Sequence, residues 1–506
     1  MGRNQQNMRI KILICFIYVS VVLVATIYSQ EIRESYTLSE QELSLRFSEP
    51  VDTIISDLKI FIPNYMNNEN IPGVQIAFIH EGKIVWSEGF GVTNTITREL
   101  VTSNTLFEVA SLSKVVTAYM ALKLIEEGKL SFEKPLHNYL TQEWLTPSVY
   151  RDSIHLSHVL SHSSGLGKMS KDIMFKPGTA YYYSANGYIF LKEVMEEVTE
   201  ESFENLAQRL VFKPLGMKSS SFVKQSEFAI RTSNGHIRAL IPFILFGILF
   251  TTLFVIILLI GLLIIRLRTK SWELRRLYLV IILSISFILL ASAIFIILGS
   301  SSLTEFAWVL VISGFVLLTL FLLLFYVGRS LFIKKLSHRR GIKIILSYLW
   351  SFVIIVLIFF CSIKIKNIPV PDWTDYDVSP AGTLRTSAQE LALFLIEISN
   401  PQFLKIETGE YLRTSQIKLS NNLGWGMGPG ILYSEQGYAL WQWGQHIDFQ
   451  SIMIIYPEHE FGVVICTNND LLNPDVAVEI AHRALGGKIE PLRLAIHLQY
   501  DYVEQN

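Results

Sequence analysis

A serine and a lysine three residues apart, Ser111 and Lys114, are the side chains of this sequence best suited to chemistry. Residues at this spacing lie on one face of a helix, so the lysine amine can approach the serine hydroxyl. A desolvated, neutral amine helps to activate a hydroxyl as a nucleophile. The pair therefore indicates nucleophilic acyl transfer, provided that the rest of the chain builds a site around it.

The spacing is not specific by itself. The same arrangement occurs at four other places, Ser56/Lys59, Ser131/Lys134, Ser221/Lys224 and Ser415/Lys418. A single match of this kind is more often accidental than catalytic, so the surrounding sequence has to decide whether Ser111 is a nucleophile.

The elements around the pair predict a mixed α and β domain. Two hairpins are expected, one from the β-rich runs 74–79 and 83–88 and one from the runs 450–456 and 461–467. Apolar periodicity predicts helices over 105–128, 186–199, 387–398 and 475–485. Because strands stand at both ends of this sequence, we expect both ends to build one shared sheet.

A block of apolar runs interrupts the predicted domain. Four runs of about the length that crosses a bilayer lie at 239–265, 277–298, 306–327 and 342–363. The loops after the first and third runs are rich in Lys and Arg, whereas the loop after the second has neither, so the positive-inside rule places the two basic loops in the cytoplasm. Four crossings return the chain to its starting side, and we expect both soluble parts to face outward. We also expect the two ends of the insertion to lie close together.

The amino terminus agrees with an outward-facing domain. Arg3, Arg9 and Lys11 precede the apolar stretch 12–28, which exports the following chain as a signal peptide or as an uncleaved anchor. The lack of a clean cleavage site before Gln30 favours the anchor. The expected organisation is an export segment, a first catalytic part, an inserted four-helix transmembrane module, a second catalytic part and a tail, at 1–30, 31–236, 239–363, 370–490 and 491–506.

Composition narrows the function classes. The 506 residues are 50% hydrophobic and 17% charged with a net charge of −1, which fits a membrane protein with a large globular part and argues against a nucleic-acid partner. Cys15, Cys361 and Cys466 offer no disulfide framework. We find no metal-ligand spacing and no glycine-rich phosphate loop, and we expect neither a metal nor another cofactor.

A series of motifs in a fixed order separates Ser111 from the other matches. The segments are Ile71-Pro72-Gly73-Val74, 105–114, 124–130, Leu160-Ser161-His162-Ser163-Ser164-Gly165-Leu166, Pro177-Gly178-Thr179, Pro214-Leu215-Gly216-Met217, 381–387 and 424–428. Together they resemble the serine β-lactamase-like hydrolases, in the branch of class C β-lactamases, D-alanyl-D-alanine carboxypeptidases and esterases. The resemblance covers roughly 50–235 and 375–485. It implies an α+β fold with an antiparallel sheet flanked by a helical region, here with a transmembrane helical bundle inserted.

The resemblance assigns roles to the first two catalytic elements. Ser111 is the expected acylated nucleophile and Lys114 its electrostatic and proton-transfer partner. Tyr183 stands where the family has an acid/base tyrosine, although packing of this tyrosine on a sheet is an alternative. The family motif Tyr-x-Asn is altered, because the asparagine comes one place late as Asn186. Asn186 therefore reaches the site only through a local shift of the chain.

The third element departs further from the family. Relatives have Lys-Thr-Gly or His-x-Gly, whereas this chain has Gln442-Trp443-Gly444. Glutamine donates a hydrogen bond but carries no charge, which weakens recognition of a substrate carboxylate or help with proton transfer. The resemblance implies an oxyanion hole from the backbone N–H groups of Ser111 and Gln445, which tolerate changes of side chain. We interpret His446 as an ordinary surface histidine and His162 as part of a structural loop.

These observations predict an integral protein of the bacterial plasma membrane with an outward-facing serine hydrolase domain. The expected substrate is a small-molecule, peptide or lipid-linked acyl compound of the cell envelope, cleaved as a peptide, ester or lactam, and membrane lipid is the expected partner. Two alternatives stay open, an acylation-based sensor of β-lactams or cell-wall fragments and a noncatalytic envelope scaffold. The sequence does not determine the substrate or the oligomeric state. Three tryptophans near the site suit either an apolar acyl pocket or core packing, Trp425, Trp441 and Trp443.

Overall fold

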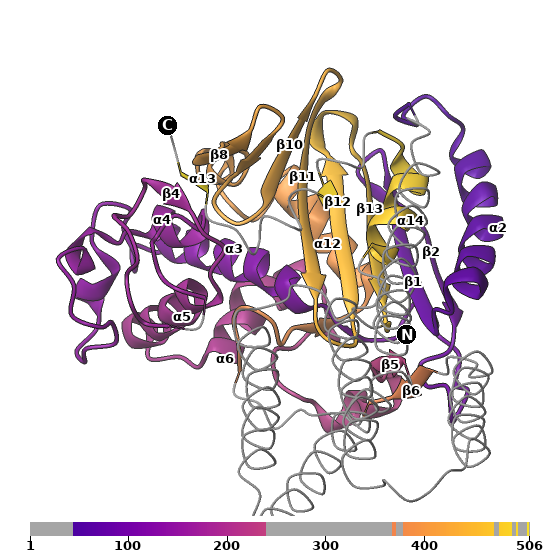
Figure 1. Cartoon of the computed structure of the whole chain (residues 1–506), viewed down its shortest axis with the longest axis horizontal. Coiled ribbons are helices and arrows are strands. Elements are labelled where there is room, and N and C mark those ends of the chain that lie inside the picture. The colour runs from indigo at the N-terminus through magenta and orange to yellow at the C-terminus, as the bar shows by residue number, and fades with distance from the viewer. Residues whose placement is uncertain are drawn as a thin grey trace, which may run out of the picture.

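An antiparallel sheet forms the centre of the molecule (Figure 1). The computed structural model describes residues 44–168, 170–238, 367–370, 378–469, 475–487, 492–493 and 503–504. Within these residues the sheet has eight strands in the order β2-β1-β13-β12-β11-β10-β9-β8. Their bounds are β1 Gly73–His80, β2 Lys83–Gly91, β8 Ile417–Ser420, β9 Leu423–Trp425, β10 Gly430–Ser434, β11 Gly437–Gln445, β12 Gln450–Tyr456 and β13 Phe461–Thr467.

The two ends of the described sequence share this sheet, as predicted. β1 pairs with β13 in the register Val74↔Thr467 to Ile79↔Gly462. The predicted hairpins β1–β2 and β12–β13 are both confirmed. All seven residues of β12 and of β13 are buried, which explains their continuous apolar sequences. β2 stands at the edge of the sheet and is largely half-buried or exposed.

Helices cover both faces of the sheet. α2 (Val51–Glu69) and α14 (Val476–Leu485) pack on one face, and α12 (Ala388–Ser399) and α3 (Ser113–Glu126) on the other. Successive residues of a strand point to opposite faces. Ile76 and Phe78 of β1 therefore pack in the core with α2 and α14, whereas Ala77 and Ile79 pack in the core with α3 and α12. The sheet is therefore packed between helices on both faces.

A helical region lies beyond α3, on the left of Figure 1. α3 is buried over most of its length, because it separates this region from the sheet. The other helices are α4 Leu156–Leu160, α5 Ala185–Thr199, α6 Phe203–Ala207, α7 Lys213–Leu215 and α13 Ile406–Arg413. Short helical turns and strands complete the described part: η1 Ala110–Leu112, η2 Leu136–Tyr139, η3 Arg151–Ser153, η4 Gln208–Phe212, η5 Ser226–Arg231, η6 Pro457–His459, β3 Phe107–Glu108, β4 Ala180–Tyr181, β5 His236–Arg238, β6 Asn367–Pro369, β7 Arg385–Thr386 and β14 Val503–Glu504.

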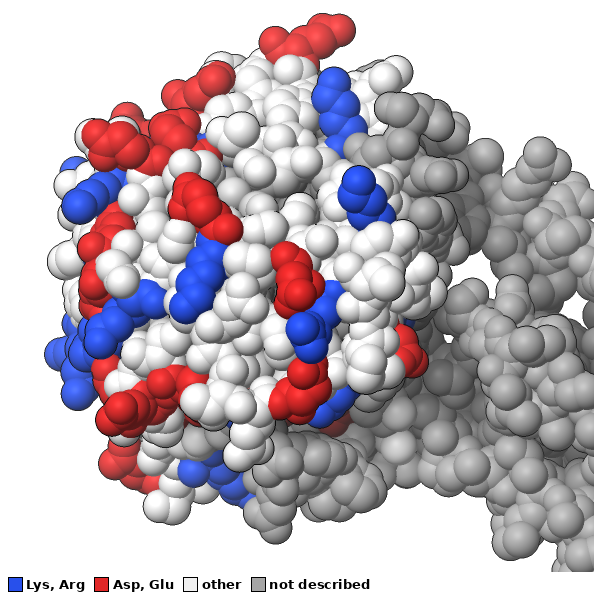
Figure 2. All heavy atoms as spheres, turned by 90° about the vertical axis from the view of Figure 1, so that its left-hand side faces the viewer, with Lys and Arg blue, Asp and Glu red and all other residues white. Residues whose placement is uncertain are grey.

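The outer face of the helical region carries interspersed charges (Figure 2). Ion pairs of this region include Arg209 with Glu127 at 2.7 Å and Arg209 with Glu201 at 2.9 Å. Such exposed pairs contribute roughly 0–1 kcal/mol each. Because both signs alternate over the face seen in Figure 2, this face presents no field of a single sign to a charged ligand.

The predicted helix 105–128 is wrong in its first third. α3 begins only at Ser113, because Phe107 and Glu108 pair as β3 with Arg385 and Thr386 of β7. The local periodicity does not reveal this pairing, which joins residues from the two halves of the chain. The other three predicted helices are confirmed as α5, α12 and α14, with boundaries within one residue of those expected.

The two ends of the predicted insertion lie side by side. His236 pairs with Pro369 between β5 and β6, and Val370 N donates to Gly235 O at 2.8 Å. The four predicted spans and the apolar stretch at 12–28 lie outside the described residues. Among the residues that are described, no helix has the length and apolar character needed to cross a bilayer.

Candidate active site

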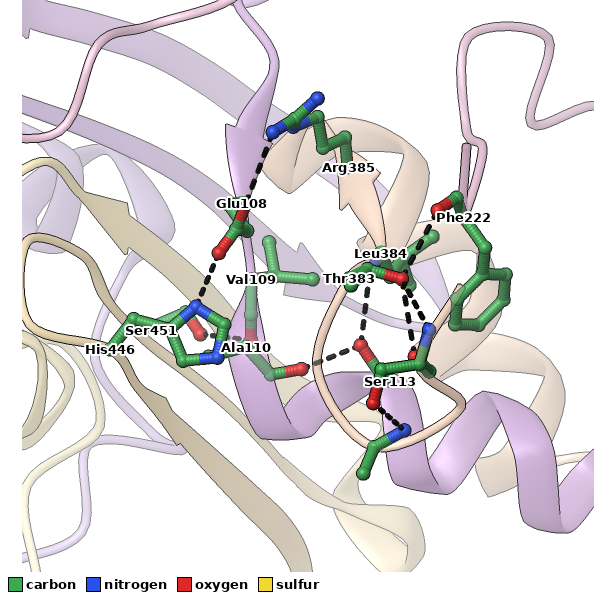
Figure 3. Close-up of polar contacts among 12 residues, drawn as sticks. Glu108, Val109, Ala110, Ser113, Phe222, Thr383, Leu384, Arg385, His446 and Ser451 are labelled. Atoms are coloured by element: carbon green, nitrogen blue, oxygen red, sulfur yellow. Dashed lines mark hydrogen bonds and ion pairs between the residues drawn. The ribbon is translucent and has the colours of Figure 1, made fainter. Parts of the chain in front are cut away.

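The loop that carries Ser111 has an unusual backbone conformation. Ala110, the residue before Ser111, has φ +48°, a left-handed value that side chains other than glycine seldom adopt. Ser113 Oγ donates to Ala110 O at 2.6 Å and accepts from Leu384 N at 3.2 Å (Figure 3). Ser113 thus ties the strained turn to the neighbouring chain and holds Ser111 at the amino-terminal edge of α3.

Lys114 is buried beside Ser111, as the spacing predicts. Its Nζ donates to Ser111 Oγ at 2.9 Å and to Ala381 O at 3.0 Å. The residue is only 2% exposed, and burial lowers the pKa of Lys114 to about 7, because the charged amine loses its hydration. At neutral pH a large fraction of the amine is therefore neutral and able to accept a proton from the Ser111 hydroxyl.

Tyr183 closes the other side of the lysine. Its ring centroid lies 4.8 Å from Lys114 Nζ, and its hydroxyl accepts a hydrogen bond from Gln442 Nε2 at 3.3 Å. The next residue, Ser184, begins α5 as its N-cap and accepts from Gly187 N at 3.1 Å. The cap fixes where the extended chain turns into the helix, and so fixes Tyr183 just outside it.

His162 supports this segment from below. Its Nδ1 accepts from Ser184 N at 3.1 Å, and its ring lies 4.1 Å from the ring of Tyr183. Burial, followed by the nearby charge of Lys114, pushes the pKa of His162 well below its ordinary value. A neutral imidazole with an unprotonated Nδ1 holds Tyr183 in place and contacts no reacting atom, in keeping with the structural role expected for His162.

Asn186 is buried in the first turn of α5. Within the described part of the chain, no hydrogen bond joins its side chain to Ser111 or Lys114. At the start of this helix, Ser184 makes the contact instead, because its Oγ donates to Gly167 O at 3.0 Å. In this chain the residue after Tyr183 is therefore the N-cap of α5.

Gln442 and Gly444 face the nucleophile loop from β11. Gln442 is buried, and its Nε2 donates to Tyr183 Oη and to Trp443 O, the latter at 2.9 Å. A Cβ on Gly444 would lie 2.1 Å from Val109 O, so only glycine lets the strand approach the loop this closely. The uncharged Gln442 is thus in direct contact with Tyr183, the candidate acid/base residue.

The strand register directs the N–H of Gln445 away from β12. Antiparallel pairs alternate between pairs that exchange hydrogen bonds and pairs whose N–H groups point away from the partner strand. His446 N donates to Phe449 O at 2.9 Å, so the next pair, Gln445 with Gln450, is of the second kind. β10 pairs with β11 only as far as Trp441. The Gln445 N–H is therefore directed away from β12 and past the end of β10.

His446 is not an ordinary surface histidine, which corrects the sequence interpretation. Its Nδ1 is hydrogen-bonded to Glu108 Oε1, and its side chain is 35% exposed. Glu108 also pairs with Arg385 at 3.2 Å (Figure 3). Burial by itself raises the pKa of Glu108. The hydrogen bond and charge of His446, together with Arg385, have the larger opposite effect, so the pKa of Glu108 lies below its ordinary value. In the sequence, Glu108 stands three residues before Ser111, but nothing there indicates that it contacts His446. Only the fold brings these two residues together.

Trp425, Trp441 and Trp443 are core residues in this structure. All three are nearly inaccessible, and the rings of Trp441 and Trp443 stack at 5.7 Å. They belong to the core that includes residues of α2 and α14, and this core also reaches Tyr183, whose ring centroid lies 5.3 Å from that of Trp443. Of the two uses left open by the sequence, the structure supports packing. Among the described residues, no group of three His, Cys, Asp or Glu side chains is arranged to hold a metal ion.

Comparison with known proteins places this geometry in a fold. The Beta-lactamase family profile matches residues 59–241. Protein flp of Staphylococcus aureus (strain NCTC 8325 / PS 47) is 24% identical over 200 residues, which cover 35% of this chain and 39% of flp. Unguisins hydrolase ungD of Aspergillus violaceofuscus is 28% identical over 183 residues, which cover 29% of this chain and 31% of that protein. The matches thus span well under half of these relatives.

A solved structure extends the similarity. The octameric penicillin-binding protein homologue from Pyrococcus abyssi superposes with a TM-score of 0.54 at 18% identity, over 88% of this chain and 77% of that chain. The chain therefore has the α/β fold of the serine β-lactamases and penicillin-binding proteins. Proteins of this fold family are serine hydrolases. In this fold Ser111, Lys114 and Tyr183 lie next to one another.

Proposed function

We propose that this protein is a serine hydrolase that forms an acyl-enzyme on Ser111. The observation that carries the proposal is the 2.9 Å hydrogen bond between Lys114 Nζ and Ser111 Oγ inside a buried site, where burial lowers the pKa of Lys114 to about 7. An amine with this pKa accepts and returns a proton near neutral pH, which is the property that a general base needs. Among the pairs with the same spacing, the contact contrasts with Ser131, whose hydroxyl bonds an exposed Glu133.

The reaction proceeds by two acyl transfers. Ser111 Oγ attacks the carbonyl carbon, its proton passes to the neutral Lys114 amine, and the carbonyl oxygen becomes an oxyanion held by the N–H groups of Ser111 and Gln445. Because Gln442 donates to the Tyr183 oxygen, the phenolic proton is directed elsewhere, and it passes to the leaving group as the carbonyl bond to that group breaks. The Lys114 ammonium then restores the tyrosine proton. Water repeats the attack on the ester and releases the acid and free Ser111.

The substrate is an ester, a peptide or a lactam. Within the fold, the ordered motifs and the position of Tyr183 favour the branch of class C β-lactamases, carboxypeptidases and esterases. Gln442 carries no charge, so a substrate carboxylate gains less here than beside a lysine or histidine. Its buried Oε1 has no hydrogen-bond partner among the described residues. A neutral donor on the substrate, such as an amide N–H, suits that acceptor.

The site faces the outside of a bacterial plasma membrane in this proposal. Its support is the charge of the loops between the four apolar runs, together with the pairing of β5 with β6, which brings the two ends of that block together. The substrate then belongs to the cell envelope. A cysteine introduced at Ser301 should react with an impermeant thiol reagent in intact cells, and one at Lys270 only after permeabilisation. Reaction at Lys270 in intact cells would reverse the orientation.

Covalent labelling tests the chemistry. The full-length protein is exposed to a fluorophosphonate and, separately, to a tagged penicillin, and each label is then chased. Label on the wild type and on Ser131→Ala, with none on Ser111→Ala, supports the nucleophile. Loss of a penicillin label during the chase indicates turnover, whereas a stable adduct favours an acylation-based sensor. Equal labelling of Ser111→Ala would end the proposal.

A further inference from the structure

Three of the chain segments that build the candidate site meet at His446. The first segment carries Glu108 and, three residues later, Ser111. The second is the loop of Ala381, whose carbonyl accepts from Lys114 Nζ at 3.0 Å. The third is the end of β11, where Gln445 directly precedes His446.

The imidazole of His446 contacts the first two segments with its two nitrogens. Nδ1 is hydrogen-bonded to the Glu108 carboxylate. Nε2 lies 3.0 Å from the point that a Cβ on Gly382 would occupy, so the ring fills the space that this glycine leaves beside Ala381. The residue thus joins β3, the Ala381 loop and the end of β11 through one rigid ring.

Glu108 is itself held in place. The strand β3 is paired with β7, and the Glu108 carboxylate bonds Arg385 of β7 at 3.2 Å. Arg385 and His446 outweigh the effect of burial, and the pKa of Glu108 stays below its ordinary value, so the carboxylate is ionised at neutral pH. An ionised acceptor makes a stronger hydrogen bond to the imidazole than a neutral one would.

The end of β11 needs such an anchor. The pairing of β11 with β10 ends at Trp441, so the following residues of β11 have a partner strand on one side only. The turn that follows is closed by the bond from His446 N to Phe449 O, and Ile447 within it is half exposed. Ser451 Oγ donates to Val109 O at 2.9 Å, which ties β12 but not Gln445 itself to the nucleophile loop.

We propose that the Glu108–His446 pair is a positioning device that holds the N–H of Gln445 at the correct separation from the N–H of Ser111. The pair touches no reacting atom. It acts on the oxyanion, because a donor displaced by a few tenths of an ångström stabilises the transition state less while substrate still binds. This inference rests on the proposed acyl transfer at Ser111 and names the residues that prepare its oxyanion hole.

The test compares variants of the full-length protein by the saturable kinetics of fluorophosphonate labelling. His446→Ala removes the ring, His446→Asn keeps a donor near the position of Nδ1, and Glu108→Gln keeps an acceptor without charge. His459→Ala is the control, because His459 lies at the opposite end of β12 and bonds Gln436 O. We expect His446→Ala to lower the maximal labelling rate by about 10- to 100-fold, somewhat less than loss of a whole oxyanion donor, with the half-saturating probe concentration unchanged.

Rescue and coupling separate positioning from simple loss of structure. His446→Asn should recover most of the rate, and adding Glu108→Gln to His446→Ala should cost nothing further, because the two side chains act as one unit. An arylboronic acid, whose adduct with serine is a tetrahedral anion, should lose affinity in the same order as the rates. Should His446→Ala fail to fold, Glu108→Gln and His446→Asn carry the test.

The outcomes are distinct. Wild-type labelling with unchanged maximal rates in His446→Ala and Glu108→Gln would overturn the positioning role and leave the nucleophile assignment intact. A higher half-saturating concentration at unchanged maximal rate would also overturn it, since the pair would then serve binding. Absence of label on the wild type would instead overturn the proposed acyl transfer.

Discussion

The two sides of the candidate site present different kinds of groups to a substrate, mainly side chains near α3 and mainly backbone groups on β11. On the side of the helical region, the buried Lys114 and Tyr183 lie beside the partly buried Ser111, and their side chains are the ones proposed to transfer protons. On the side of the sheet, β11 offers Gln442, an uncharged side chain, and otherwise backbone groups. On the first side, burial lowers the pKa of Lys114 to about 7. On the second side, the strand register sets the direction of the backbone N–H groups. We therefore expect side-chain changes to be costly near α3 and backbone changes to be costly on β11.

The largest effect is expected from the lysine. Lys114→Met removes the amine that receives the Ser111 proton, and we expect the fluorophosphonate labelling rate to fall by about 10²- to 10⁴-fold. The matched control is Lys134→Met, which has the same spacing from a serine but lies over the Tyr139 ring. A rate within a few-fold of the wild type for Lys114→Met would show that the helical side does not carry the proton transfer.

A backbone change on the sheet side comes next. Gly444→Ala puts a Cβ about 2.1 Å from Val109 O, so β11 has to move away from the nucleophile loop. We expect destabilisation of roughly 1–3 kcal/mol from overpacking and a drop in labelling of at least about tenfold. Chemical denaturation and labelling kinetics measure the two effects. Gly128→Ala is a weaker control, since a Cβ there meets nothing although its φ of +70° adds strain.

The pH dependence sharpens the role of the lysine. Burial lowers the pKa of Lys114 from 10.5 to about 7, and only the neutral amine accepts the serine proton. The labelling rate should therefore rise by about tenfold per pH unit below pH 7 and level off above it. Measurement between pH 5 and 9 on the wild type and on Lys114→Met tests this. A profile that is flat, or identical in the variant, contradicts the assignment.

Gln442 is the place where the sheet side is expected to tolerate a change. Gln442→Met keeps the volume and removes the bond to Tyr183 Oη, and we expect labelling to fall by less than about tenfold, the size of one neutral hydrogen bond. Gln442→His restores a titratable group and should raise the rate with penicillin relative to that with the fluorophosphonate. A collapse of labelling in Gln442→Met would mean that this strand contributes an essential side chain after all.

The smallest effect is expected from a change outside both sides of the candidate site. Because β5 and β6 already bring Gly235 and Val370 together, replacing residues 239–366 by a short flexible linker should leave the labelling rate unchanged. Loop closure costs little, on the order of 0.6 kcal/mol per doubling of length. A variant that unfolds cooperatively but does not label would show that the replaced segment shapes the site.

Local sequence patterns were enough to predict much of this molecule. β-rich runs and short turns predicted the hairpins β1–β2 and β12–β13, and helical periodicity predicted α5, α12 and α14. Such elements are decided by residues a few places apart, whose side chains share a face. The Ser111–Lys114 contact is of the same kind, because one helical turn brings the two residues together.

Only the tertiary structure decided the remaining features. The start of α3 at Ser113 follows from the pairing of β3 with β7, and the contact of Gln442 with Tyr183 joins residues 259 positions apart. The pairing of Glu108 with His446 spans 338 positions, so neither residue carries a local sign of the other. Such contacts arise when the sheet closes and desolvates the groups between its layers, and desolvation also sets the pKa of Lys114. Sequence patterns therefore predicted the candidate reacting groups, whereas packing determined their surroundings and the pKa of Lys114.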